Sequence, residues 1–133
     1  MAYTENAKVV SVVAGTTFSS TSVYKFVVLD SNGRVVDPNT TGNVLPFGVL
    51  YGRTHSTDAD GVEAVPVAID GIVKIKAAAS TLDKGQFIGA STAGLAIAPT
   101  TDAYTYGVIL DGSSGGAGRV LTVAVTRGPL SAP

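Results

Sequence analysis

Residues 62–79, VEAVPVAIDGIVKIKAAA, decide the fold class of this chain. They form two runs rich in β-branched residues, and Asp70-Gly71 separates the runs. An Asp-Gly step between two such runs is typical of a tight β-hairpin, so we expect two strands that pair with each other. In the second run apolar residues alternate with two lysines, which predicts one buried and one solvated face. Pro66 has no backbone N–H to donate, so its strand is predicted to lie at a sheet edge or to be bulged.

Short runs of similar composition lie on both sides of this central segment. Asn32-Gly33 predicts a two-residue hairpin turn, and further turns are expected at Leu82–Gly85 and Ser91–Gly94. The runs between turns predict strands over 8–13, 23–29, 34–36, 47–51, 86–90, 95–98, 104–110 and 119–126. Only residues 77–82 favour a single helical turn. Turn signals at intervals of about eight to twelve residues predict an all-β fold, a small β-sandwich or β-barrel.

The composition fits one folded domain. The chain has 133 residues, of which 45% are hydrophobic and 14% are charged. A soluble domain typically has about a quarter of its residues charged, so this chain has no signature of disorder. No second domain and no repeat of fixed period is visible. We therefore predict a single β domain over 1–133, with a flexible N-terminal arm at 1–7, a β core at 8–127 and a C-terminal tail at 128–133.

Charge and cysteine content argue against several classes of protein. The formal net charge is −1 and the Lys and Arg residues are scattered, so the basic patch of a nucleic-acid-binding protein is missing. The lack of Cys excludes disulfides and thiolate metal sites. The start shows no signal-peptide pattern, and no apolar run approaches the ~20 residues of a membrane span. We expect a protein that is made in the cytoplasm and binds neither nucleic acid nor a membrane.

One segment has the letters of a hydrolase motif but lacks its context. Residues 112–116 match the G-x-S-x-G nucleophile pattern, which needs a strand before it and a helix after it. Here a strand follows, and the sole histidine, His55, precedes Ser114 in the chain. We expect no enzyme and no cofactor. A hydrolase that uses Ser114 and His55 is the third hypothesis, after two binding functions.

The metal-site patterns are also incomplete. Aligned on Gly61, the sequence DADG at 58–61 resembles a calcium loop, but Val67 stands where the bidentate Glu belongs. Zinc needs three or four nitrogen or sulfur ligands, and His55 has no second His or Cys to join it. We expect no metal. An isolated calcium site remains an open alternative, with Asp58, Asp60 and Glu63 as its ligands.

Tyrosines supply the alternative binding function. Tyr104 and Tyr106 share one face of a predicted strand and are the pair that we expect to be exposed, whereas Tyr24 is expected in the core. Exposed aromatic rings stack on sugars, and no basic residues interleave with this pair, which disfavours nucleic acid. Together with the polar loop 52–61, the pair favours a carbohydrate- or receptor-binding β module of a virion or cell surface.

A pattern of valines and glycines extends from the central segment into the next strands. It follows V-x-V-x-x-x-G-x-x-x-V and then G-x-x-V/I, and the matching residues are Val65, Val67, Gly71, Ile75, Gly85 and Ile88. This pattern, with the order of elements from Phe47 to Val125, resembles the capsid cement, or head decoration, proteins of tailed bacteriophages. Residues 1–46 fall outside the resemblance.

The resemblance implies a structural virion protein. Proteins of this family bind the outer surface of a phage capsid, often as homotrimers, and stabilise the head by bridging subunits of the major capsid protein, which is the implied partner. Many weak contacts repeated around a symmetric shell add up without any catalytic residue. We expect the polar arm to contact the shell, and the residues concerned are Ala2, Tyr3, Thr4, Glu5 and Asn6. The expected location is the virion, after synthesis in the host cytoplasm.

Overall fold

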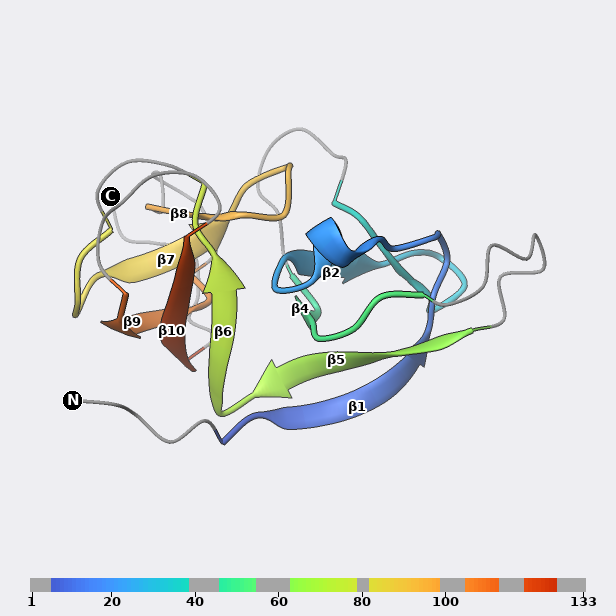
Figure 1. Ribbon diagram of the computed structural model, residues 1–133, viewed down its shortest axis with the longest axis horizontal. Helices are drawn as coiled ribbons and strands as arrows, with labels where there is room; N and C mark the ends of the chain where they lie inside the picture. The colour runs from blue at the N-terminus through green and yellow to red at the C-terminus, as the bar shows by residue number, and fades with distance from the viewer. Residues whose placement is uncertain are drawn as a thin grey trace.

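The computed structural model describes residues 6–38, 46–54, 63–78, 82–98, 105–112 and 119–126. Within these ranges, ten strands form two antiparallel five-stranded sheets, and one short 3-10 helix, η1 (Ser20–Ser22), lies outside them. The prediction of an all-β fold is confirmed. Figure 1 shows the two sheets side by side, the first in blue to green and the second in green to red.

The first sheet is formed by consecutive strands of the N-terminal half. These strands are β1 (Lys8–Val13), β2 (Phe26–Leu29), β3 (Val35–Val36), β4 (Gly48–Leu50) and β5 (Ala64–Asp70). They lie in the order β1-β5-β4-β2-β3, and a parallel bridge from Ala14 to Val35 brings the two ends of the sheet together. The sheet therefore curls toward a small barrel, whose interior holds Ala14, Phe18, Val27, Val35, Leu50, Val65 and Val67. We call residues 8–70 the N-terminal unit.

The second sheet repeats this arrangement in the C-terminal half. Its strands are β6 (Ile72–Lys76), β7 (Phe87–Ala90), β8 (Ala96–Ile97), β9 (Gly107–Asp111) and β10 (Val120–Val125). They lie in the order β6-β10-β9-β7-β8, and a parallel bridge from Ala77 to Ala96 joins the ends. We call residues 72–125 the C-terminal unit. Its interior belongs to a larger apolar cluster, which also includes Phe26, Val49 and Ala68 of the N-terminal unit.

The two units are copies of one β motif, which the sequence analysis did not find. Matching β1–β5 with β6–β10 gives the same strand order and the same closing bridge. The register matches as well, since Phe26 pairs with Val49 as Phe87 pairs with Val108. Further positions match through their backbone hydrogen bonds, such as the Tyr24 amide to the Leu50 carbonyl and the Gly85 amide to the Ile109 carbonyl.

The junction between the units corrects two predictions about the central segment. β5 pairs with β1 and β4, whereas β6 pairs with β10, so the predicted hairpin at Asp70-Gly71 is wrong. Gly71, with φ 90°, is instead the corner at which the chain passes from one sheet to the other. The prediction that Pro66 lies on an edge strand or at a bulge is also wrong, because β5 lies between two strands and its register with β1 is regular at Pro66. The Pro66 carbonyl accepts from the Tyr51 amide, so the ring nitrogen of Pro66 also points toward the β4 side. Tyr51 lies one residue beyond the end of β4, so no strand residue there needs an N–H from Pro66.

Most other strand predictions are confirmed, with two differences in detail. The strand predicted from residue 23 begins only at Phe26, because Tyr24 has a φ of 70° and cannot continue a strand. The turn at Asn32-Gly33 does join paired strands β2 and β3, but it is longer than two residues, since the Asp30 amide bonds to the Arg34 carbonyl. Residues 1–5, 79–81 and 127–133 lie outside the described residues, so most of the arm, part of the helical candidate and the tail stay untested.

Candidate functional site

The residues behind the catalytic and metal hypotheses lie mostly outside the described part of the chain. This holds for His55, Asp58, Asp60 and Ser114. Glu63 is described and half-buried, and its backbone carbonyl accepts from the Ala14 amide at 2.8 Å. Within the described ranges, no three His, Cys, Asp or Glu side chains gather to hold a metal ion. No described helix is long and apolar enough to cross a membrane.

The tyrosine pair that was expected to be exposed is not an open platform. Tyr104 lies outside the described residues, and Tyr106 is only 1% exposed, so the prediction is wrong for Tyr106. Its ring packs edge-on against Phe26, with 4.7 Å between ring centroids. Strand alternation predicts which side chains share a face, but it does not predict that Phe26 of the N-terminal unit packs on this one ring. Tyr24, expected in the core, is half-buried and packs edge-on against Tyr51.

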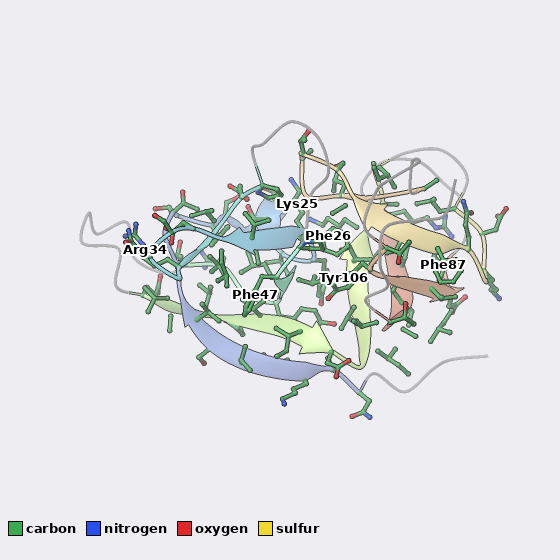
Figure 2. All side chains as sticks on the ribbon, turned by 180° about the vertical axis from the view of Figure 1, so that it is seen from behind. Lys25, Phe26, Arg34, Phe47, Phe87 and Tyr106 are labelled. Carbon is green, nitrogen blue, oxygen red and sulfur yellow. The ribbon has the colours of Figure 1, made fainter. Side chains whose placement is uncertain are left out.

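The contact between the two units is made by the outer face of the first sheet and the free edge of β6. Phe26, Val49 and Ala68 are fully buried on this face. The Lys74 amide donates to Tyr51 Oη and the Lys76 amide donates to the Tyr24 carbonyl, both at 2.8 Å. Figure 2 shows Phe26 beside Tyr106 between the two sheets. Apolar burial and backbone hydrogen bonds therefore act together to hold the units in place.

Beside this contact, an open groove lies where the chain passes between the units. Its volume is about 410 Å³, and it is lined by Lys8, Phe47, Ile69, Asp70, Val125 and Thr126. Phe47, Ile69 and Val125 make part of the lining apolar, and Lys8 and Asp70 add one charge of each sign. Such a mixture suits a protein segment better than a phosphate backbone, which needs several positive charges.

The polar arm enters the fold close to this groove. Of the five residues predicted to contact a capsid, Ala2 to Glu5 lie outside the described residues, and Asn6 is exposed. The Asn6 carbonyl lies against Gly71, so closely that a Cβ at position 71 would overlap it. Ala7 is half-buried against the apolar cluster of the C-terminal unit. The last residues of the arm are thus held at the corner between the units.

Large apolar side chains are exposed on both sheets, among them Phe87, Val9 and Val13. Phe87 is 52% exposed on the outer face of the second sheet, and Figure 2 shows it on the side away from the first sheet. Val9 and Val13 are 45% and 38% exposed on β1, which forms a rim of the first sheet. The sequence already indicated that apolar side chains of β1 would be exposed. Valines occupy both faces of KVVSVV at 8–13, more than one buried face requires.

The turns that follow β2 and β7 are built alike but differ in charge. Asp30 Oδ1 accepts from the amides of Asn32 and Arg34, each at 2.9 Å, and Oδ2 accepts from Arg34 Nε at 3.1 Å. The bond from the Arg34 amide is the main cause that holds the pKa of Asp30 below its usual value of 3.8, and partial burial opposes it. In the second turn Ser91 Oγ accepts from the amides of Ala93 and Leu95.

Comparison with protein-family models, curated proteins and solved structures finds no match to this chain.

Proposed function

We propose that this protein binds the outer surface of a tailed-phage capsid and stabilises the head by bridging subunits of the major capsid protein. The observation that carries the proposal is the groove of about 410 Å³ beside the point where the arm enters the fold. A polar arm whose last residues enter the fold beside a partly apolar groove offers a strap and a docking place for a protein surface. The net charge of −1 fits a protein partner better than nucleic acid.

The residues that carry the resemblance to cement proteins serve the fold. Val65, Val67, Ile75 and Ile88 are all buried. Gly71 and Gly85 have φ values of 90° and 82°, a region that favours glycine. The resemblance therefore supports a shared scaffold, and the contacts with the shell must come from other residues. We assign them to the arm, with Ala2 to Asn6 as the contact residues, and to the groove beside it.

The function requires repeated weak contacts and no chemistry. A homotrimer of this protein carries three arms, so that one arm can rebind while the others hold the particle in place. The arm loses conformational freedom when it binds, and this cost lowers the affinity of each single contact. Bridging of neighbouring capsid subunits then follows from the spacing of the arms within one oligomer. The expected location is the outer surface of the virion.

Binding to heads tests the proposal directly. Heads assembled from the major capsid protein of the same genome are mixed with the full chain, and bound copies per head are measured by cosedimentation. We expect saturable binding and a higher temperature of DNA release from decorated heads. No binding at about 10 µM, where even weak contacts repeated on a shell are occupied, would contradict the proposed function.

Two matched truncations test the arm. Deletion of residues 1–5 is expected to weaken binding to heads by roughly tenfold or more, because every copy loses the same contact. Deletion of residues 129–133 removes the same number of residues from the other end and is expected to leave binding unchanged. If both truncated proteins bind as tightly as the full chain, the arm is not the contact and only the groove remains.

A further inference from the structure

The contact between the two units has two sides, each of which has a counterpart elsewhere in the molecule. One side is the outer face of the first sheet, formed by Phe26, Val49 and Ala68. We call it the inserting face. The other is the receiving edge of the C-terminal unit, formed by the outward amides of β6 and the turn at Gly94. Because the units share one topology, the C-terminal unit has its own inserting face and the N-terminal unit has its own receiving edge.

Within the molecule, the inserting face packs against the receiving edge of the C-terminal unit. The Lys74 and Lys76 amides are hydrogen-bonded to Tyr51 Oη and to the Tyr24 carbonyl. The Phe26 amide donates to the Gly94 carbonyl at 2.7 Å, and a Cβ on Gly94 would lie 3.0 Å from the Phe26 carbonyl oxygen. Both sides are therefore covered.

In the described part of the chain, no strand lies against the counterpart of the inserting face. It consists of Phe87, Val108 and Ala124, which match Phe26, Val49 and Ala68 in strand register. All three remain apolar, and Phe87 is 52% exposed where Phe26 is fully buried. An exposed phenylalanine beside two partly buried apolar residues of the same sheet face is typical of a protein-protein contact.

The counterpart of the receiving edge is also uncovered. β1 occupies the place of β6, and the Ala14 amide bonds toward β5, so the amides of Ser11 and Val13 point away from β5. Among the described residues, no strand pairs with β1 on that side. Gly33 matches Gly94, and no atom lies within 4 Å of its Cβ position. An open strand edge of this kind is a template for pairing with another chain.

We propose that copies of this protein associate head to tail, with the inserting face around Phe87 of one copy seated on the β1 receiving edge of the next. The occupant is a second copy because this chain already joins the same two surfaces once within itself. The contact is heterologous, so it builds a closed ring or an open chain. The inference does not rest on binding to a capsid. The resemblance to cement proteins implies an oligomer without saying which surfaces pair.

The contact between copies is weaker than the contact within one chain. Leu110 follows Ile109 where Tyr51 follows Leu50, so the hydroxyl that accepts from Lys74 has no counterpart. Loss of this bond lowers the affinity, whereas the apolar part of the contact is kept. Association is therefore expected to depend on protein concentration.

Sedimentation of the full chain between about 1 and 200 µM, a range that covers micromolar dissociation constants, tests the proposal. We expect the mass to rise above that of a monomer. Phe87→Ser should shift the midpoint of association upward by tenfold or more. The matched control is Val120→Ser, since Val120 is 38% exposed, begins β10 four residues before Ala124 and is not one of the residues that define either surface. A monomeric full chain at 200 µM, or association that Phe87→Ser leaves unchanged, would overturn the proposal.

Mixing two variants tests the head-to-tail arrangement. Ser11→Pro removes an outward amide from the receiving edge, and Gly33→Asn, which places a side chain in the open space, serves if the proline variant does not fold. At the concentration where half of the full chain is associated, each variant alone is expected to be mostly monomeric. A mixture of Phe87→Ser with the edge variant retains one intact pair of surfaces and should form dimers that grow no further. If the mixture stays monomeric, or if the edge variants associate like the full chain, the arrangement is wrong.

Discussion

Phe26 and Phe87 occupy the same position in two copies of one β motif, yet Phe26 is fully buried and Phe87 is 52% exposed. Both begin the second strand of their unit, and both face outward from its sheet. The difference arises because the C-terminal unit lies against the first of these faces and nothing in the described chain lies against the second. Burial of an outward residue in this molecule is therefore decided by the neighbouring unit and not by the motif itself.

The largest expected effect comes from truncating these two residues separately. Phe26→Ala leaves a cavity in the contact between the units and should lower the free energy of unfolding by about 3–5 kcal/mol. Phe87→Ala should cost less than about 1 kcal/mol when measured at ~1 µM, where copies are separated. Urea unfolding of both variants provides the measurement. Equal losses would mean that the two faces are not distinguished by burial.

A second pair of variants tests what the two units share. Gly48 and Gly107 are matched residues, and a Cβ on either would overlap a carbonyl oxygen of the adjacent strand, that of Ala68 or Ala124. Gly48→Ala and Gly107→Ala should each cost about 1–3 kcal/mol of stability, because the overlap arises inside each unit. Gly33→Asn is the control, since open space surrounds it and Asn tolerates positive φ. A large cost at only one of the two alanine variants would show that the copies have diverged in their cores.

The smallest effect concerns the two turns and depends on pH. The pKa of Asp30 in the folded protein lies below its usual value of 3.8, so the ionised side chain stabilises the fold above that value. This stabilisation is lost as the pH falls through the folded pKa. Asp30→Ser copies the turn of Ser91 and should make stability less dependent on pH below about 4. Thermal melts between pH 2 and 7 measure this, and Ser91→Ala should lower stability equally across the range.

The sequence predicted strands far better than it predicted how they pair. Runs of β-branched residues and turn glycines located most strands, because both signals are local. Asp70-Gly71 misled the prediction, since a positive φ at glycine serves a hairpin and a corner equally well. Whether the glycine forms a hairpin or a corner depends on which apolar core buries Val67 and which buries Val73. The residues next to Gly71 in the sequence do not determine this. Pro66 misled it too, because β4 ends at Leu50, one residue before the position opposite Pro66, and the missing N–H therefore breaks no ladder bond.

The repeated motif was hidden by loops of different length. The sequence separation between matched residues decreases along the chain, from the pair Ala14 and Ala77 to the pair Val67 and Val123, so the repeat has no fixed period. The clearest trace in the sequence is FGVL at 47–50 against YGVI at 106–109. The glycine of each is required by close approach of the neighbouring strand, and such matched glycines are the signal that locates the repeat.

The arrangement of strands along the chain also has a consequence for synthesis. Every described strand of the N-terminal unit ends at or before Asp70, and every described strand of the C-terminal unit begins after Gly71. The first unit is thus complete on the ribosome while the apolar face around Phe26 still meets water, a stage at which nascent chains are prone to mispair. On one polysome, adjacent chains display this face together, and a C-terminal unit leaving one ribosome can dock on its neighbour's first unit. We expect slower translation after Gly71 to favour pairing between two polypeptides over pairing within one.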